Sequence, residues 1–452
     1  MKFIFSLFVL LSSCNLFAQN HHERFENMDV MHYMFEIHLN DSTNRIEGNA
    51  MLLINFLKPV QSFTLDLVGI DSTNMGMIVE SVKVGSFYRN FTHSNNLLKI
   101  EIPGFDTTGT VKFIECNIKY SGIPADGLVI SKNKYGDRTF FGDNWPDRAK
   151  HWLPTVDHPS DKSTLHFVVY APSHYQVISN GTLVEVSNLE NGLKKTVWNE
   201  NVPISTKLMV IGVADFVVGN KETFNNIPVS FWEFPQNKKK GFDNYKFGAK
   251  ALKYFSELIG PYSYEKLAHV QSKIRYGGME NASCIFYHEN TNFSDQSQER
   301  LFTHETAHQW FGNSVTEQNW HHIWLSEGFA TYLTYVYNQN FLGEKHFRNG
   351  LINDRKRVIN YATRNFAPII DTTITEYIGL LNANSYQKAS WFLHMLRDKV
   401  GDSIFFAGLQ KYYHDFQNST ALTKDFQKVM ERVSEQELDL FFYQWLWQPG
   451  FP

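Results

Sequence analysis

The sequence predicts a multi-domain fold, with an all-β antiparallel sheet or sandwich domain first and a mostly helical α/β domain after it. Three observations support this prediction. Short alternating or β-branched runs recur every ten to fifteen residues between about positions 29 and 220, and turn residues separate them. After about Gly219 the apolar residues follow helical spacing instead. The chain has 452 residues, 43% of them hydrophobic, so it can bury the cores of two or three domains.

The first residues, MKFIFSLFVLLSSCNLFAQN, have the pattern of an export leader. Lys2 supplies a positive charge, and the apolar segment 3–11 is too short to anchor the chain across a bilayer. Ala18 is a small residue, so 1–18 is predicted to be a signal peptide that is cleaved after it. We therefore expect an exported protein, periplasmic or extracellular. The alternative is a lipoprotein, because LSSC resembles a bacterial lipoprotein signal that would place the lipid on Cys14.

After the leader, the first domain is placed at residues 19–220 and the second at 221–452. Runs such as MHYMFEIHL, RIEGNAMLLINF and STLHFVVYAP predict the strands of the first domain. In the second domain, FDNYKFGAKALKYFSELIGPY predicts a helix that begins after Asp243 and stops before Gly260. Further helices are predicted around residues 299–312, 325–340, 386–398, 403–416 and 424–436, with strands near 227–233 and 266–288.

Composition and charge narrow the range of functions. The formal net charge is −4 and the basic residues are scattered, whereas a nucleic-acid-binding protein needs a broad basic face. Nucleic acid is therefore not an expected partner. No stretch after the leader is long and apolar enough for a transmembrane helix. Cys116 and Cys284 either form a disulfide across 168 positions or remain buried free thiols.

The stretch His304-Glu305-Thr306-Ala307-His308 has the HExxH pattern of a zinc site. On an α-helix, residues four positions apart lie on one face, about 6 Å apart along the axis, so both imidazoles can bind one ion. Glu305 lies between them, where it can hydrogen-bond a metal-bound water. The surrounding LFTHETAHQWF is amphipathic, which predicts that the histidines lie on a buried face and need polar partners there.

A tetrahedral zinc site that catalyses a reaction needs a third protein ligand and one open position. Glu327, within WLSEGFATY, follows His308 after 18 intervening residues, which leaves room for a turn and a second helix. We therefore predict a site of two histidines and one glutamate. His321 and His322 precede the second helical stretch and are interpreted as loop residues, and Glu317 is interpreted as an exposed loop residue.

Other segments carry a family resemblance. Residues 276–281 (YGGMEN) lie upstream of HExxH, and NSYQKASWFLHMLR, which contains Tyr386, lies downstream. The first half contributes HWLPTVDHPSDKSTLHF and VISNGTL. Together with HExxH and WLSEGFA, these segments resemble the aminopeptidase N and leukotriene-hydrolase family of zinc metallopeptidases (gluzincins) over roughly residues 29–452. The resemblance implies a thermolysin-like catalytic domain, in a short form without the C-terminal helical domain of many relatives.

The resemblance implies a zinc-dependent aminopeptidase that hydrolyses the N-terminal peptide bond of short peptides. One zinc ion would be bound by His304, His308 and Glu327. Glu305 would activate the zinc-bound water as general base. Tyr386 takes the position of the tyrosine that stabilises the oxyanion in this family.

The YGGMEN segment is expected to bind the substrate. Its carboxylate, Glu280, would capture the free α-amino group at the closed end of a cleft, so that only the first peptide bond reaches the metal. Gly277, Gly278 and Met279 would lie beside the substrate as an added strand does, because glycine allows a close backbone approach. The expected partners are therefore peptides with a free N-terminus.

One departure from the family bears on specificity. The family's β domain usually offers a glutamine to the amino end of the substrate, but TFFGDNWPDRAKHWLP has none. Asp143 and Asn144 lie there instead, and an acid at this place would favour basic N-terminal residues. Two alternatives to an aminopeptidase stay open: an endopeptidase on the same zincin core, and a non-catalytic peptide-binding module.

Overall fold

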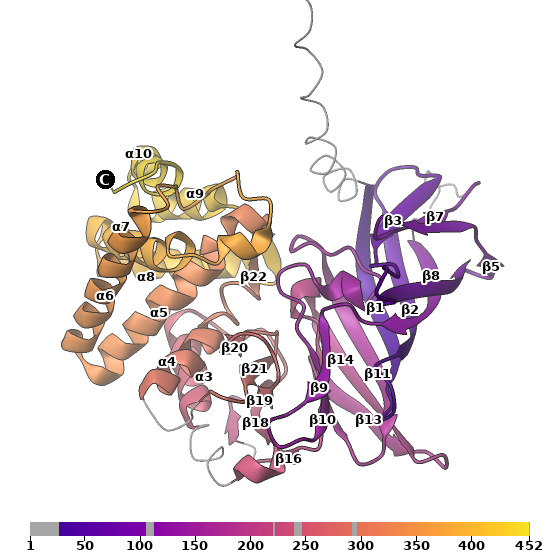
Figure 1. Cartoon of the computed structure of the whole chain (residues 1–452). Coiled ribbons are helices and arrows are strands. Elements are labelled where there is room, and N and C mark those ends of the chain that lie inside the picture. Colours follow the sequence, from indigo (N-terminus) through magenta and orange to yellow (C-terminus); the bar gives the residue numbers. More distant parts are fainter. Residues whose placement is uncertain (1–26, 105–112, 220–221, 239–245, 292–295, 452) are drawn as a thin grey trace, which may run out of the picture.

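The computed structural model describes residues 27–104, 113–219, 222–238, 246–291 and 296–451. A β-rich part, indigo to magenta in Figure 1, lies beside a mostly helical part, orange to yellow. The predicted fold class is confirmed: an N-terminal β domain is followed by a helical domain that contains a smaller sheet. The predicted signal peptide at 1–18, Cys14 and the predicted helix cap Asp243 lie outside the described residues.

The β domain is built around one large sheet. Its strand order is β13-β14-β11-β1-β2-β8-β4-β5. Alternate residues of β2 and β11 are buried, as expected for strands whose two faces differ in exposure. Neighbouring strands are antiparallel except β1 and β11, which run parallel. The strands are β1 (Met28–His38), β2 (Ile46–Phe56), β4 (Gly76–Val84), β5 (Phe87–Tyr88), β8 (Phe113–Ile123), β11 (Lys162–Pro172), β13 (Thr182–Asn188) and β14 (Leu193–Ser205).

Two smaller sheets complete the β domain. One has the strand order β3-β7-β6, and the other has the order β12-β15-β10-β9. The four-stranded sheet matters for function, because the chain leaves the end of β10 and enters the segment that borders the candidate site. The strands are β3 (Ser62–Asp66), β6 (Phe91–Ser94), β7 (Leu97–Glu101), β9 (Leu128–Lys132), β10 (Arg138–Gly142), β12 (Gln176–Ser179) and β15 (Ile211–Ala214).

The second domain places helices against a mixed sheet of order β16-β18-β19-β21-β20, with β17 paired to β18. Its strands are β16 (Val217–Val218), β17 (Glu222–Phe224), β18 (Ile227–Glu233), β19 (Leu267–Ser272), β20 (Gly278–Met279) and β21 (Cys284–His288), and β22 (Val315–Glu317) pairs with β23 (Ser419–Ala421). The helices are α3 (Lys246–Leu258), α4 (Gln296–Ala307), α5 (Trp324–Leu342), α6 (Glu344–Ala362), α7 (Ala389–Val400), α8 (Asp402–Phe416), α9 (Thr423–Ser434) and α10 (Asp439–Phe442). The short helices are η1 (Ala149–His151), η2 (Thr206–Leu208), η3 (Pro235–Asn237), η4 (Trp320–His322), η5 (Tyr377–Leu380), and the π-helices η6 (Asn384–Lys388) and η7 (Tyr443–Trp447).

One long helix, α6, is absent from the sequence-based predictions. Only Phe347, Leu351, Asp354 and Val358 are buried on it, so its apolar stripe is narrow. Gly350 also interrupts the helical pattern in the sequence. A side chain does not fit at this position, because a Cβ there would lie 2.6 Å from the Tyr335 ring. The helix is therefore held by packing on α5 rather than by its own periodicity.

Buried lysines join the two domains. Lys207 of the β domain forms an ion pair with Glu317 on β22, and both side chains are almost fully buried. The prediction that Glu317 lies on an exposed loop is therefore wrong: a buried carboxylate needs a cation, and the sequence does not reveal one 110 positions away. Lys162 Nζ donates to the carbonyls of Asn313 at 2.9 Å and Ser314 at 2.7 Å.

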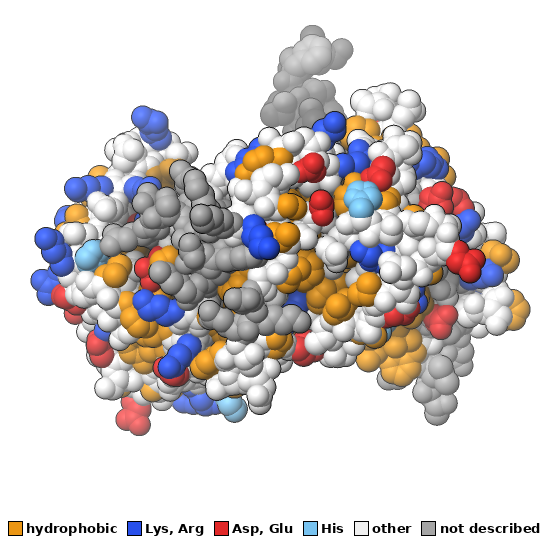
Figure 2. All heavy atoms as spheres, turned by 90° about the horizontal axis from the view of Figure 1, so that it is seen from below, with side chains coloured by type: hydrophobic (Ala, Val, Ile, Leu, Met, Phe, Trp, Pro, Cys, Tyr) orange, Lys and Arg blue, Asp and Glu red, His pale blue; other side chains and the backbone are white. Residues whose placement is uncertain are grey.

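The surface seen from below carries lysine and arginine side chains interspersed with acidic ones (Figure 2). Among the residues that the structure describes, no helix has the length and hydropathy needed to cross a membrane. Cys116 and Cys284 are both buried free thiols.

Candidate active site

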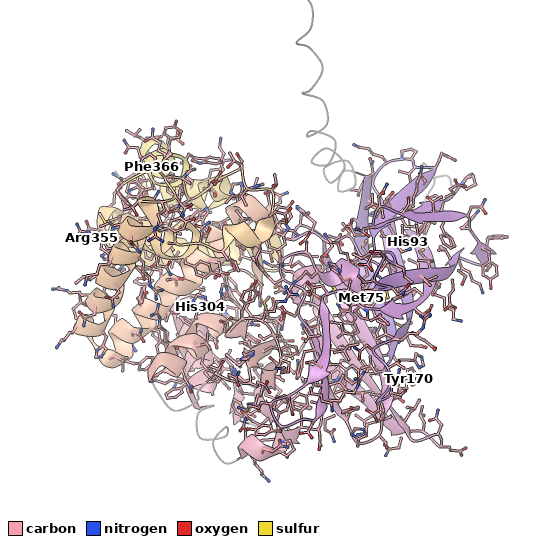
Figure 3. All side chains as sticks on the ribbon, viewed as in Figure 1. Met75, His93, Tyr170, His304, Arg355 and Phe366 are labelled. Atoms are coloured by element: carbon pink, nitrogen blue, oxygen red, sulfur yellow. The ribbon has the colours of Figure 1, made fainter. Side chains whose placement is uncertain are left out.

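Two histidines at the end of α4 begin the site. The helical hydrogen bonding continues one residue beyond Ala307, because the backbone N–H of His308 donates to the carbonyl of His304 at 3.2 Å. Both imidazoles therefore lie on one face of the helix. Figure 3 shows His304 within the helical domain. Their Nε2 atoms are 3.1 Å apart.

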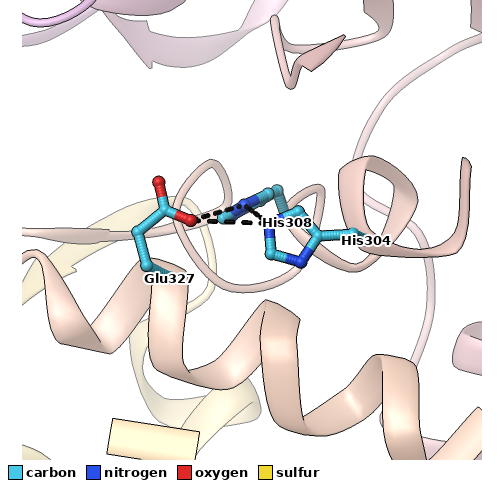
Figure 4. Close-up of side chains that lie close together, drawn as sticks. All are labelled: His304, His308 and Glu327. Carbon is cyan, nitrogen blue, oxygen red and sulfur yellow. Dashed lines mark hydrogen bonds and ion pairs between the residues drawn. The ribbon is translucent and has the colours of Figure 1, made fainter. Parts of the chain in front are cut away.

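Glu327, in the first turn of α5, completes the cluster (Figure 4). Its Oε2 atom lies 3.5 Å from His304 Nε2 and 3.3 Å from His308 Nε2. α5 is buried along most of its length, so Glu327 is only 5% exposed. The reversal between α4 and α5 brings the third ligand candidate back to the first two.

The surroundings of His308 set its tautomer. Its Nδ1 atom lies 3.2 Å from the carbonyl oxygen of Phe311 and 3.0 Å from Ser326 Oγ. A carbonyl only accepts, so Nδ1 carries the proton and Nε2 presents its lone pair to the cluster. Gly312 makes this approach possible: its φ is +116°, and a Cβ there would lie 2.2 Å from Ser326 Oγ.

These residues fit a zinc ion. Zinc–nitrogen bonds of about 2.0–2.1 Å at a tetrahedral angle put two ligand nitrogens roughly 3.3 Å apart, close to the observed separation. Oε2 of Glu327 is buried and makes no regular hydrogen bond to any described residue, so it has an acceptor position to offer. Two imidazoles and one carboxylate are the ligand types of a zinc site that keeps an open position.

Glu305 lies beside this cluster and is 5% exposed. Burial raises the pKa of its carboxyl well above the usual range; His308 opposes this shift, and Glu280 and Glu327 add to it. Gly278 packs directly on the carboxyl, since a Cβ there would lie 2.4 Å from Glu305 Oε1. The glycine at 278 therefore leaves room for the Glu305 carboxyl, in addition to allowing a substrate to approach the backbone of β20.

Glu280 follows β20 and is fixed through its backbone. Its carbonyl oxygen accepts hydrogen bonds from Gln309 Nε2 at 2.8 Å and from Asn313 Nδ2 at 2.6 Å. Its Oε1 atom is buried and has no hydrogen-bond partner among the described residues. Single oxygen or nitrogen atoms of Glu280, Glu305 and His308 lie within 4.8 Å of one another. An unpaired buried carboxylate oxygen next to the histidines is a site for a cationic group of a ligand.

The β domain helps to hold this segment. Asn180 Nδ2 donates to the carbonyl oxygen of Ala282 at 2.7 Å, and the Gly181 N–H donates to Ser283 Oγ at 2.8 Å. Both contacts lie within three residues of Glu280. The position of the carboxylate therefore depends on both domains.

Tyr386 reaches the site from the π-helix η6. Its ring stacks on that of His304, with 6.3 Å between the centroids and 15° between the planes. Burial and the nearby Glu327 carboxylate raise the pKa of its hydroxyl well above 10. The hydroxyl is therefore protonated and available as a hydrogen-bond donor.

A cavity of about 240 Å³ joins these groups. All nine sequence-predicted site residues line it: His304, Glu305, His308, Glu327, Tyr386, Gly277, Gly278, Met279 and Glu280. Tyr276, Leu301, Leu381 and Trp145 also line it. His321 and His322 do not, because His321 Nε2 lies 3.0 Å from the Ile374 carbonyl oxygen and His322 Nδ1 lies 2.7 Å from Thr423 Oγ1.

The residues that the β domain contributes to the cavity are not the expected ones, because neither Asp143 nor Asn144 faces the substrate space. Asp143 is fully buried in an ion pair with Arg148, and Asn144 donates to the Met209 carbonyl at 2.6 Å. The expectation that Asp143 offers an acid to the substrate is therefore wrong. Trp145, which the sequence interpretation passed over, lines the cavity instead. Its only sequence signal was its position, directly after these two residues.

Comparison with known proteins identifies the family. The Peptidase M1 N-terminal domain matches residues 30–208, and the Peptidase family M1 domain matches residues 244–445. The chain belongs to peptidase family M1. It is 29% identical over 327 residues to glutamyl aminopeptidase of Bitis rhinoceros, covering 69% of this chain and 34% of that protein. It is 30% identical over 338 residues to aminopeptidase A of Gloydius brevicauda, covering 71% and 35%. The matches span about a third of the length of these relatives.

Solved structures share the fold of this M1 chain. The M1 zinc metallopeptidase of Deinococcus radiodurans superimposes with a TM-score of 0.77 at 22% identity, covering 94% of this chain and 95% of that one. Native yeast LTA4 hydrolase gives a TM-score of 0.80 at 19% identity, covering 95% and 69%. The two-domain fold described above is therefore shared with both of these solved structures.

Proposed function

We propose that this chain is a zinc-dependent aminopeptidase that removes the first residue of short peptides. The observation that carries the proposal is the buried, unpaired Oε1 of Glu280 in the same cavity as His304, His308 and Glu327. The family membership and the aminopeptidase relatives support the same reaction class.

Glu280 explains why cleavage would be confined to the N-terminus. The ammonium group of a peptide would pair with this carboxylate in a site of low dielectric constant, where a charge-assisted hydrogen bond is strong. Pairing at a fixed point sets the register of the peptide, so the first peptide bond comes to the metal cluster. Trp145 and Tyr276 would form the nearby apolar wall.

The reaction chemistry divides among the remaining groups. Bound zinc would supply Lewis acidity at the scissile carbonyl and a more acidic water at neutral pH. A carboxylate oxygen of Glu305 takes a proton from the attacking water and later delivers it to the leaving amine. The Tyr386 hydroxyl donates a hydrogen bond to the oxygen on which negative charge develops.

The leader supports a further part of the proposal, export from the cytoplasm. A soluble periplasmic or extracellular enzyme is the first choice and a lipoprotein anchored through Cys14 is the second. Mass spectrometry of the mature protein decides between them: an N-terminus at Gln19 supports the first and a lipid-modified Cys14 supports the second.

The test is a panel of fluorogenic aminoacyl amides, each assayed free and N-acetylated, with and without a zinc chelator. Release is expected only from free-amine substrates and only before chelation. Release from the N-acetylated amides at the same rates as from the free ones would support the endopeptidase alternative instead. No release from any free-amine substrate by the metal-loaded protein would refute the proposal.

Glu305→Gln is the matched variant for the role of the base. We expect it to keep its zinc, because Glu305 is not among the ligand residues, and to lose about 10²–10⁴-fold in kcat. Zinc content, measured by atomic emission, separates the two causes of lost activity: a folding defect would lower it, whereas loss of the base alone would not. Unchanged hydrolysis by Glu305→Gln would refute the assigned role.

A further inference from the structure

A second cavity borders the π-helix η6, which also carries Tyr386. It has a volume of about 250 Å³ and is bordered by α6, η6, α7 and η7. Figure 3 labels Arg355 on α6, on the side of the helical domain that faces away from the β domain. This cavity and the active-site cavity share none of their lining residues. It is therefore a separate feature from the proposed catalytic site.

The charges in this cavity are all positive. Arg355 and Lys388 line it, and no aspartate or glutamate is among its described lining residues. Lys388 is only 2% exposed, whereas Arg355 is exposed. The ammonium group of Lys388 makes no ion pair or side-chain hydrogen bond with any residue in the described part of the chain.

A lysine side chain that is almost fully buried and whose ammonium has no partner among the described residues is an unusual feature of a folded protein. Burial lowers the pKa of Lys388 to about 8, so the side chain is still mostly charged at neutral pH. Most buried charges have an opposite charge or several hydrogen bonds that offset the loss of water. An anion in the cavity would provide that compensation.

The remaining walls are apolar and aromatic. Trp391, Trp445 and Phe451 line the cavity together with Ile359 and Val358. The faces of indole and phenyl rings bind a flat or aliphatic body. The cavity therefore combines one anion-binding end with an apolar compartment.

We propose that this cavity binds a small monocarboxylate with an aromatic or aliphatic body, its carboxylate paired with Lys388 and Arg355. The volume restricts the ligand to about the size of one amino-acid residue or slightly more. A zwitterionic amino acid is disfavoured, because no described lining residue offers an acid to its ammonium group. This inference does not depend on the proposed peptidase activity.

Isothermal titration of the full metal-loaded chain with 3-phenylpropionate tests the proposal. The neutral analogue 3-phenylpropan-1-ol, zwitterionic L-phenylalanine and inorganic phosphate are the comparison probes. 3-Phenylpropionate is expected to bind about tenfold or more tightly than each of them. No binding of 3-phenylpropionate up to about 10 mM, or equal binding of the alcohol, would overturn the proposal.

Variants locate the bound carboxylate. Lys388→Met should weaken 3-phenylpropionate binding about 10- to 100-fold. Arg355→Gln should weaken it about three- to tenfold, because the guanidinium is exposed. Lys356→Gln, the next residue on α6 and also exposed, is the matched control and should bind as the unaltered chain does.

If Lys388→Met does not fold, Arg355→Gln still tests the proposal, because replacing an exposed side chain on α6 should not disturb folding. Binding that both Lys388→Met and Arg355→Gln leave unchanged would place the carboxylate elsewhere, for example at the active-site metal, and would refute the inference. Because binding is measured without turnover, that failure would leave the proposed aminopeptidase activity untouched.

Discussion

Glu317 and Glu327 are ten positions apart and both are almost fully buried, yet their surroundings differ. Glu317 at the domain boundary has the ammonium of Lys207 as its partner. Glu327 in the active site faces two imidazole nitrogens instead. A buried acid paired with an ammonium joins two parts of a fold, whereas one that faces two imidazoles is arranged to bind a metal ion.

Removing the acid on the active-site side should have the largest effect. Glu327→Gln is expected to release the metal and to lower kcat/KM about 10³–10⁴-fold, because zinc supplies several kcal/mol of transition-state stabilisation. The fold should persist, since the neutral amide needs no cation. Zinc content after dialysis, together with circular dichroism, checks this expectation. Full zinc occupancy in Glu327→Gln would show that this residue is not a ligand.

Breaking the pair at the domain boundary should instead affect stability. Lys207→Met leaves Glu317 buried without its cation and should lower the free energy of unfolding by about 3 kcal/mol. The double variant Lys207→Met/Glu317→Leu should recover most of that loss. Denaturant unfolding of the three proteins measures both values. Equal stability of the single variant and the unaltered chain would mean that the pair is not structural.

The approach of β20 to the base offers a smaller test on the active-site side. Gly278→Ala places a methyl group only 2.4 Å from Glu305 Oε1, so the carboxyl must move. We expect a loss of about 10- to 100-fold in kcat with metal content unchanged, because a misplaced base catalyses poorly. Gly69→Ala in the β domain, outside the active site, is the control, since a Cβ there would meet only the His93 ring, at 3.5 Å. Equal activity of the two variants would contradict the argument.

A third kind of buried acid, in the β domain, should give the smallest effect. Asp161 accepts hydrogen bonds from the Val30 N–H at 3.3 Å and from the Tyr33 hydroxyl at 3.1 Å, but it has no cation among its hydrogen-bond partners. Burial, and then Asp29, raise its pKa from 3.8 to about 7. Between about pH 4 and pH 7, Asp161 is therefore protonated in the folded chain and ionised in the unfolded chain.

The stability that this proton contributes is fully present below the unfolded pKa and is lost as the pH rises through about 7. Asp161→Asn removes the titration, so its stability relative to the unaltered chain should increase by about 1–2 kcal/mol between pH 6 and pH 8. Thermal unfolding across this range tests the sign. A difference between the two proteins that stays constant with pH would show that Asp161 is not protonated in the folded state.

The comparison of these acids also explains what the sequence could predict. His304, His308 and Glu327 were predicted because helical spacing and a short reversal are local properties. The environment of Glu317 depends on Lys207, which lies in the other domain, and no local pattern reports such a pairing. Trp145 was missed for the same reason. Of residues 143–145, only Trp145 lines the cavity, because Asp143 and Asn144 are held by partners elsewhere in the fold.

α6 gives the same lesson for the fold. Its buried stripe is narrow and its interior holds a glycine, so periodicity was too weak to predict a helix, although packing against α5 specifies one. The strands of the β domain were predictable in kind, because alternation is local. Their order, including the parallel pair β1 and β11, depends on contacts between distant segments and was not.

The lysines at the domain boundary have a consequence for protein engineering. Lys162 and Lys207 reach from the β domain into the helical domain, and Lys266 reaches back to the Ser179 carbonyl at 2.8 Å. A chimera that took its first domain from another family member would bury these charges opposite mismatched groups. The two domains are thus not interchangeable modules, and recombination would have to transfer both sides of each lysine contact together.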